Sequence, residues 1–138
     1  MNKKIAIVTG GLGAIGSTTC RVLAQSGHTV IAADLASAKA RWPALQATLG
    51  NLDIHFEPVD VSDFGQCGEF IKRVNTHYGP VSVLINNAGI TRDGVLKKME
   101  LADWEAVIAV NLNSVFNLCR QVVDGMCERG HGRSRPRR

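Results

Sequence analysis

Short apolar runs alternate along the chain with longer segments whose apolar residues recur at helical spacing. The runs are predicted strands, since strands of a buried parallel sheet carry apolar side chains on both faces; they cover residues 4–8, 28–34, 53–61 and 81–85. The segments between them have the period of amphipathic helices and cover residues 14–26, 37–49, 64–77 and 101–126. This alternation predicts βαβ units and a parallel sheet.

Single residues mark several boundaries of these elements. Gly27 is a C-terminal stop for the first helix, and Asp63 can cap the third. Pro43 lies inside the second helical segment, which therefore starts or kinks there. Pro58, near the end of the third strand, predicts an edge strand.

The first strand leads directly into TGGLGAIG, residues 9–16. Gly11, Gly13 and Gly16 give the pattern G-x-G-x-x-G between a strand and a helix. Such glycines let a pyrophosphate approach the backbone, and the helix N-terminus offers it free N–H groups. The alternative is a glycine-rich turn without a ligand. A nucleoside triphosphatase loop is set aside, because Ser17 stands where that motif needs lysine.

Asp34 ends the second strand at the offset where an acidic residue meets the adenosine ribose. A carboxylate accepts from both ribose hydroxyls and repels a 2′-phosphate, so the sequence favours NAD(H) over NADP(H). The alternative is a helix-capping aspartate. Lys39 and Arg41, just downstream, would weaken the preference.

Composition and charge limit the other functional classes. The 138 residues are 45% hydrophobic, which is typical of a globular domain. Residues 1–127 carry eleven basic and eleven acidic residues, so the net charge of +4 comes from the tail ERGHGRSRPRR. No basic face for nucleic acid is evident. We recognise neither a signal peptide nor an apolar run long enough for a membrane span, and therefore expect a cytoplasmic protein without a membrane partner.

The cysteines do not suggest a metal site. Cys20, Cys67, Cys119 and Cys127 form no C-x-x-C pair, and no histidine pair has ligand spacing. We expect free thiols, buried or half-buried.

Four motifs in order and spacing resemble the short-chain dehydrogenase/reductase family: TGGLGAIG, the Asp60-Val61 pair in PVDVSD, NNAG ending at Gly89, and VNLNSVF around Asn111. Within the family, NNAGITRDGVLKKM and the segment after it are most similar to acetoacetyl-CoA reductases, with 3-oxoacyl-acyl-carrier-protein reductases a close second. The resemblance covers residues 1 to about 133, the first half of a family domain.

The resemblance implies an α/β fold, the N-terminal half of a Rossmann doubly wound parallel sheet with strand order 3-2-1-4 and helices on both faces. Residues 1–128 would form this half-domain. The implied activity is NAD- or NADP-dependent reduction of a 3-oxoacyl thioester, acetoacetyl-CoA to 3-hydroxybutanoyl-CoA. The implied partner is an acyl thioester of CoA or acyl carrier protein, and full-length relatives would form homo-oligomers.

The resemblance also assigns site residues. Gly10, Gly13 and Gly16 would shape the turn under the pyrophosphate, Asp60 would bind the adenine amino group, and Asn111 would be catalytic, holding a water of the proton relay. The full cofactor-binding set is Thr9, Gly10, Gly11, Leu12, Gly13, Ile15, Gly16, Asp34, Asp60, Val61, Asn87, Ala88 and Gly89. Ala14 replaces a family glycine, and its methyl group is expected to crowd the turn slightly.

The family's chemistry needs a tyrosine as proton donor, a lysine four residues later and a serine, all after the fifth strand. The one tyrosine here, Tyr78, is followed four residues later by Ser82 and precedes the fourth strand. We interpret it as a helix-end packing residue. The 138-residue chain is therefore predicted to have little or no turnover, which leaves a catalytically inactive dinucleotide-binding fragment as an alternative.

The C-terminal residues depart from the family pattern. After HGR the family continues with an apolar strand, whereas SRPRR has no strand character. Residues 129–138 are predicted to be a disordered basic tail. Our hypothesis is a shifted reading frame or a truncated gene product, and the alternative is a tail for an acidic partner. The fourth strand would then be an exposed apolar edge and the chain only marginally stable.

Overall fold

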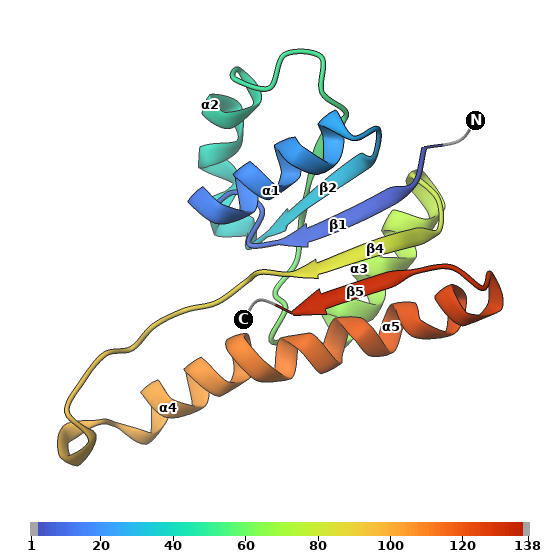
Figure 1. Ribbon diagram of the computed structural model, residues 1–138. Helices are drawn as coiled ribbons and strands as arrows, with labels where there is room; N and C mark the ends of the chain where they lie inside the picture. Colours follow the sequence, from blue (N-terminus) through green and yellow to red (C-terminus); the bar gives the residue numbers. More distant parts are fainter. Residues whose placement is uncertain (1–2, 137–138) are drawn as a thin grey trace.

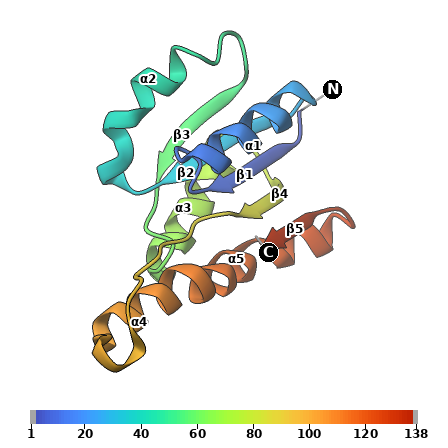
Figure 2. The same cartoon turned by 60° about the vertical axis from the view of Figure 1, so that its left-hand side comes forward.

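A five-stranded parallel sheet with helices on both faces forms the structure (Figures 1 and 2), a computed structural model that describes residues 3–136. The strands are β1 (Ile5–Thr9), β2 (Thr29–Asp34), β3 (Ile54–Pro58), β4 (Val81–Asn86) and β5 (Arg133–Pro136). The helices are α1 (Ala14–Gln25), α2 (Trp42–Gln46), α3 (Phe64–His77), α4 (Leu101–Ile108) and α5 (Ser114–Glu128). Shorter turns are η1 (Ala36–Arg41), η2 (Leu96–Lys98) and the π-helical η3 (Ala109–Asn113).

The sheet order is β3-β2-β1-β4-β5, which confirms the predicted order 3-2-1-4 and adds a fifth strand. Alternate residues of β1 enter two separate cores. Ile5 and Ile7 belong to the core that includes α3 and α5, and Ala6 and Val8 to the core on the α1 and α2 face. Burial on both faces explains why this strand is apolar at consecutive positions.

The predicted boundaries are confirmed at three places. The Asp63 carboxylate accepts a hydrogen bond from the Gln66 N–H at 2.9 Å and caps α3. Pro58 ends β3, which lies at the sheet edge. Pro43 lies in the first turn of α2, after η1, so the segment predicted as helix 37–49 is two shorter elements.

The predicted helix over residues 101–126 is helical throughout but not uniform. The π-helical η3 separates α4 from α5, at the point where Asn111 hydrogen-bonds the backbone of Ile90. Such π turns commonly interrupt helices at functional sites.

Within residues 3–136, one helical segment, Leu101–Glu128, is long and apolar enough by length and composition to cross a membrane. It has a mean hydropathy of 1.3 over its most apolar window, 22% of which is buried. The expectation that no segment of the chain reaches this length is therefore corrected. The same segment packs on the sheet through Leu118 and Val122, which is also what an amphipathic helix of a globular domain does.

The tail departs most from expectation. Arg133–Pro136 form β5, which pairs in parallel with β4 from Val83 to Asn86, so the prediction that this segment has no strand character is wrong. The free edge of β4 offers backbone N–H and C=O groups, and pairing with them does not depend on side-chain type. The exposed edge is therefore β5 and not β4. Residues 137–138 of the tail lie outside the described part, and the division at residue 128 stays a prediction.

The four cysteines are free, as predicted. Cys20 and Cys67 are buried and Cys119 half-buried, whereas Cys127 is exposed, contrary to expectation. Burial raises the pKa of both Cys20 and Cys67 to about 12, so these thiols stay protonated and inert at neutral pH.

Candidate functional site

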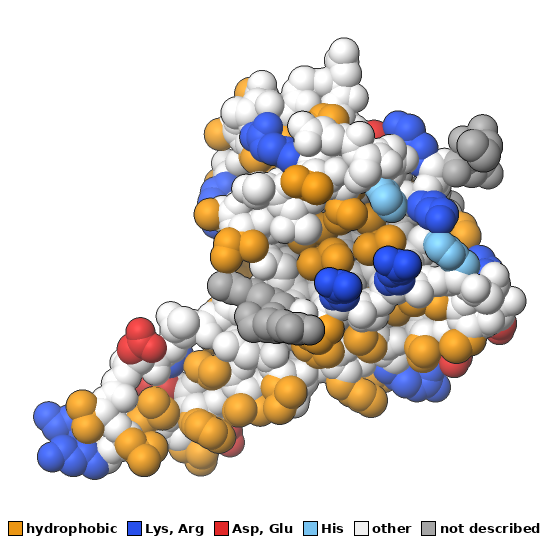
Figure 3. All heavy atoms as spheres, in the orientation of Figure 1, with side chains coloured by type: hydrophobic (Ala, Val, Ile, Leu, Met, Phe, Trp, Pro, Cys, Tyr) orange, Lys and Arg blue, Asp and Glu red, His pale blue; other side chains and the backbone are white. Residues whose placement is uncertain are grey.

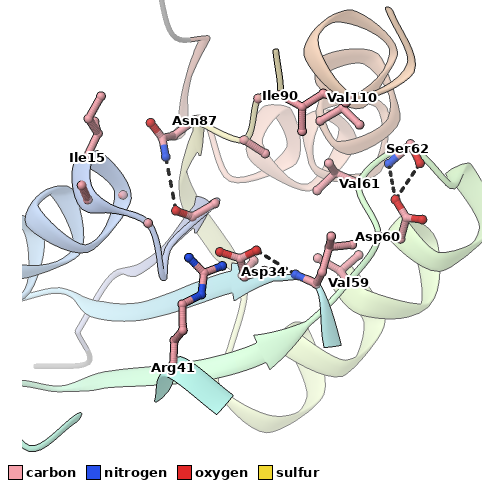
Figure 4. A pocket seen from close by; sticks show the side chains of 18 of the residues that line it. Ile15, Asp34, Arg41, Val59, Asp60, Val61, Ser62, Asn87, Ile90 and Val110 are labelled. Atoms are coloured by element: carbon pink, nitrogen blue, oxygen red, sulfur yellow. Dashed lines mark hydrogen bonds between the residues drawn. The ribbon is translucent and has the colours of Figure 1, made fainter. Parts of the chain in front are cut away.

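A cleft of about 620 Å³ opens at the carboxyl ends of β1, β2 and β4, where open α/β sheets bind ligands (Figure 4). This size is typical of a small-molecule site. The cleft brings together most of the predicted cofactor-binding residues, namely Gly10, Gly13, Ile15, Gly16, Asp34, Asp60, Val61, Asn87, Ala88 and Gly89.

Packing within the turn requires glycine at some of its positions but not at position 13. A Cβ on Gly16 would lie 2.0 Å from the Gly10 carbonyl oxygen, and one on Gly11 would lie 2.7 Å from Ala32 Cα, so the turn's own packing requires both. A Cβ on Gly13 would meet only the Gly10 oxygen, at 3.4 Å, which is ordinary contact. Packing therefore does not demand glycine at position 13, although the residue lines the cleft. A bare backbone there suits a ligand that approaches closely.

Helix α1 begins at this turn with its N-terminus open to the cleft. Gly13 is its N-cap and provides no side-chain hydrogen bond, so the first-turn N–H groups lack the usual capping acceptor. Ala14 and Ile15 are exposed beside them. Free N–H groups and the positive end of the helix dipole favour an anion such as a phosphate.

Three predicted residues support the turn without lining the cleft. The Thr9 hydroxyl accepts hydrogen bonds from the N–H groups of Asn87 and Ala88, both at 2.9 Å. Gly11 packs against β2, and the buried Leu12 donates its N–H to Asp34 Oδ2 at 3.1 Å. Their place is behind the turn, which they fix against the neighbouring strands.

Asp34 lies at the end of β2 with both carboxylate oxygens engaged. Oδ2 accepts from Leu12 and Oδ1 from its own neighbour Leu35 at 2.9 Å. The capping alternative is not what the structure has, because Leu35 is the N-cap of η1 and no side chain caps that turn. Each oxygen keeps a second lone pair, and Asp34 lines the cleft together with Arg41 (Figure 4).

Asp60 and Val61 form another wall of the cleft. Asp60 Oδ1 accepts from Ser62 twice, from its N–H at 3.0 Å and its hydroxyl at 2.6 Å. The Val61 carbonyl accepts from Asn117 Nδ2 at 2.9 Å, which ties this loop to α5. The second carboxylate oxygen of Asp60 has no partner within residues 3–136 and is free to accept from a ligand.

Asn111 does not line this cleft but a neighbouring hollow of about 900 Å³, together with Gly89 and Ile90, which line both. Its Oδ1 accepts from Ile90 N–H at 2.8 Å and its Nδ2 donates to the Ile90 carbonyl at 2.9 Å. The side-chain amide thus fixes the loop after β4 to the π turn. The predicted relay role of Asn111 stays a prediction.

Tyr78 lies at the opposite end of the sheet. It caps α3, and its hydroxyl donates to Glu57 Oε1 at 3.1 Å. Burial, together with the Glu57 carboxylate, raises the pKa of this phenol. It lines a hollow with Lys4 and Pro80, at the amino ends of the strands and away from the glycine turn, which confirms it as a helix-end packing residue.

The sequence did not identify Val59, Ser62, Arg92 and Val110 as cleft residues. Val59 and Ser62 flank the Asp60-Val61 pair, and this adjacency in the sequence is the signal that could have identified them as cleft residues. Arg92 comes from the loop after β4 and Val110 from η3. Nothing local marks these two, because only the folded chain brings them to the carboxyl ends of β1 and β2.

Comparison with known proteins agrees with this geometry. The family model described as short chain dehydrogenase matches residues 4–133. Acetoacetyl-CoA reductase from Allochromatium vinosum is 50% identical over 133 residues, covering 94% of this chain and 54% of the relative. A 3-oxoacyl-acyl-carrier-protein reductase from Thermotoga maritima is 40% identical over 131 residues, with 94% and 52% coverage.

A solved structure has the same fold. The apo form of LigO from Sphingobium sp. strain SYK-6 superposes with a TM-score of 0.88 at 28% identity, covering 96% of this chain and 50% of that chain. The chain thus spans about half the length of the curated relatives it matches. With a family match over almost all of its residues and relatives well above 30% identity, the chain belongs to the short-chain dehydrogenase family.

Proposed function

We propose that this chain binds a nicotinamide dinucleotide in the cleft and derives from a reductase of 3-oxoacyl thioesters, most closely one that converts acetoacetyl-CoA to 3-hydroxybutanoyl-CoA. The observation that carries the proposal is the single cleft in which the glycine turn, Asp34, Asp60 and the loop after β4 meet. When bound, the cofactor supplies the hydride for carbonyl reduction.

The residues at the glycine turn have distinct proposed roles. The bare backbone at Gly13 and the free N–H groups of α1 would hold the pyrophosphate. Gly10, at φ +62°, makes the turn itself. Gly11, Leu12 and Thr9 would act from behind, by keeping the turn in position. Gly16, which lines the cleft, would keep the turn in position by its close packing against Gly10.

The remaining walls would hold the two nucleoside ends. Asp34 would accept from the ribose hydroxyls, and Asp60, with Val61 beside it, from the adenine amino group. Asn87, Ala88 and Gly89 would line the pocket at the nicotinamide end, and Asn111 would hold a water next to them.

Asp34 and Arg41 make opposite contributions to the choice of cofactor. A carboxylate favours the two free hydroxyls of NAD(H), whereas a guanidinium favours the 2′-phosphate of NADP(H). Asp34 is anchored by two backbone N–H groups, whereas Arg41 comes from the short turn η1. We therefore propose a preference for NAD(H) that Arg41 moderates.

Two alternatives remain for the activity. The Thermotoga maritima relative supports acyl carrier protein in place of CoA as the carrier of the thioester. The position of Tyr78 away from the cleft supports a chain that binds the dinucleotide without turnover, because no other tyrosine is present to protonate the carbonyl. We also propose a cytoplasmic location and homo-oligomeric full-length relatives.

Fluorescence titration with NADH, followed by an assay of NADH oxidation with acetoacetyl-CoA, tests the proposal on the 138-residue chain. We expect saturable NADH binding and little or no oxidation. Gly13→Val is the matched control, because its side chain would fill the pyrophosphate position. Absence of NADH binding by the folded chain overturns the proposal. NADH oxidation that survives in Tyr78→Phe would instead contradict the expected inactivity.

A further inference from the structure

One carboxylate oxygen of Asp60 is left free at the cleft, although the other polar groups of this residue are engaged. The Asp60 N–H donates to Gln66 Oε1 at 3.2 Å, and the Asp60 carbonyl accepts from the Asp63 N–H at 3.1 Å. Oδ1 accepts from the Ser62 N–H at 3.0 Å and from the Ser62 hydroxyl at 2.6 Å (Figure 4). Within residues 3–136, Oδ2 alone has no partner, so it can accept from a bound molecule.

The Ser62 hydroxyl is not needed to begin the helix that follows it. The N-terminus of α3 is capped by Asp63, whose carboxylate accepts from the Gln66 N–H. At 2.6 Å, the bond from the Ser62 hydroxyl is also the shortest hydrogen bond that Asp60 makes. The serine side chain therefore fixes the Asp60 carboxylate and not the helix.

The cleft walls beside Asp60 suit a flat ring. Val59 and Val61 precede and follow it along the chain, and both are buried yet line the cleft. The half-buried Val110 lines it as well. Apolar walls with a few well-placed polar groups are typical of pockets that fix the orientation of a ligand. The ring atom that faces Asp60 then decides how well the ring binds.

The acceptor at Asp60 acts locally, because the cleft has no excess of negative charge. Two acidic and two basic residues line it: Asp34, Asp60, Arg41 and Arg92. On the molecular face shown in Figure 3, acidic side chains are scattered and lie toward the edges. Attraction of a hydrogen-bond donor by Asp60 is thus short-range and depends on where Oδ2 points.

We propose that Ser62 is a positioning residue that makes the cleft select a 6-amino purine over a 6-oxo purine in the dinucleotide. The inference rests on the proposed function, in which Asp60 accepts from the adenine amino group. An ionised carboxylate is only an acceptor, so the carbonyl oxygen of a 6-oxo purine would face it without a donor. Because Ser62 holds Oδ1, the carboxylate cannot turn away to relieve that repulsion.

The Ser62 hydroxyl provides part of this restraint, and the Ser62 N–H provides the rest. The N–H is retained in a Ser62→Ala variant, so removal of the hydroxyl should loosen the carboxylate without releasing it. Selectivity between the two purines should therefore be reduced but not abolished. A role of Ser62 in folding alone would instead weaken the binding of both purines equally.

Fluorescence titration of the 138-residue chain with NADH and with its 6-oxo analogue, reduced nicotinamide hypoxanthine dinucleotide, tests this proposal. Both molecules carry the same reduced nicotinamide, so one fluorescence signal measures both affinities. We expect the wild-type chain to bind NADH about 30-fold more tightly than the analogue, on the scale of one charge-assisted hydrogen bond.

Variants of Ser62 locate the source of this ratio. Ser62→Ala should lower the affinity ratio by about fivefold, the effect of one hydrogen bond to a charged group, whereas Ser62→Thr keeps the hydroxyl and should preserve it. Ser26→Ala is the matched control, because it removes a hydroxyl that donates at 2.8 and 3.0 Å at the far end of α1. It should leave both affinities unchanged.

The possible outcomes separate this inference from the proposed function. Equal affinity of the wild-type chain for NADH and the analogue overturns the inference but not the proposed function, because the dinucleotide still binds. An unchanged ratio in folded Ser62→Ala also overturns the inference. Failure of the folded wild-type chain to bind either molecule overturns both. If Ser62→Ala does not fold, Ser62→Cys replaces the hydroxyl by a weak donor of similar size, and an unchanged ratio there overturns the inference.

Discussion

Thr9 and Asn87 hold the carboxyl ends of β1 and β4 together by two hydrogen bonds, both donated by Asn87. The Asn87 N–H donates to Thr9 Oγ1 at 2.9 Å, and Asn87 Nδ2 donates to the Thr9 carbonyl oxygen at 3.0 Å. Thr9 is 1% exposed and Asn87 is 8% exposed, so water cannot replace these partners. The pair fixes the position of the glycine turn relative to the loop after β4.

Thr9→Val should lower the free energy of unfolding by about 2–4 kcal/mol, because it keeps the shape but leaves the N–H groups of the buried Asn87 and the half-buried Ala88 without an acceptor. Thr9→Ser keeps the oxygen and should lose only about 1 kcal/mol for the missing methyl group. Urea unfolding of both variants measures the difference. Equal losses would show that the hydroxyl is not what holds this junction.

Gly13→Ala and Gly16→Ala should separate binding from folding. The Gly16 variant places Cβ 2.0 Å from a backbone oxygen and should prevent native folding, whereas a Cβ on Gly13 makes ordinary contact and should leave the melting temperature nearly unchanged. Gly13→Ala should instead weaken NADH binding, by about tenfold if the methyl displaces one phosphate hydrogen bond. Circular dichroism and fluorescence titration test the pair. Unaltered NADH affinity in a folded Gly13→Ala variant would place the pyrophosphate elsewhere.

Asp34→Asn and Arg41→Gln should shift cofactor choice in opposite directions. The Asp34 variant loses the repulsion of a 2′-phosphate, so the affinity ratio of NADH to NADPH should fall by about tenfold, on the scale of one charge-assisted hydrogen bond. Arg41→Gln should raise that ratio by weakening NADPH. Titration of each variant with both cofactors gives the two ratios. If the affinity ratio of NADH to NADPH is the same in Asp34→Asn as in the wild type, Asp34 serves only to support the glycine turn.

Asp53 should make the fold sensitive to acid. Its carboxylate accepts from the Thr29 hydroxyl at 2.6 Å, which is the main reason that its pKa is lowered, with smaller contributions from His55 and Lys3. Folding thus favours the ionised form. The resulting stabilisation is complete above the ordinary pKa of 3.8 and is lost as the pH falls through the lower value of the folded state.

Asp53→Asn should therefore reduce the free energy of unfolding at pH 6 and flatten its decline as the pH falls below about 3.8. Denaturant unfolding across this range provides the measurement, with Asp124→Asn as the control at an exposed carboxylate on α5. If the free energy of unfolding declines equally at acidic pH in the wild type and in Asp53→Asn, Asp53 is not the source of the acid sensitivity.

Much of the fold and of the cleft was predictable from local chemistry. Three features depend only on residues close in the sequence and could therefore be predicted from it: the apolar run of β1, the Asp63 cap and the glycines before α1. The same holds for Asp34, whose place at the end of β2 follows from strand length alone. Interactions between residues close in the sequence were therefore enough to predict the first four strands and most of the cleft residues.

The tertiary structure decided what depends on distant partners. It made a strand of Arg133–Pro136, because the free edge of β4 pairs with backbone whatever the side chains are. It placed Thr9 behind the glycine turn and brought Val110 to the cleft, because strand pairing and helix packing determine which way a side chain points. Sequence alone determined the periodicities and turns, which are properties of neighbouring residues; the site needed contacts between residues as far apart as Thr9 and Asn87, which form only when the sheet is assembled.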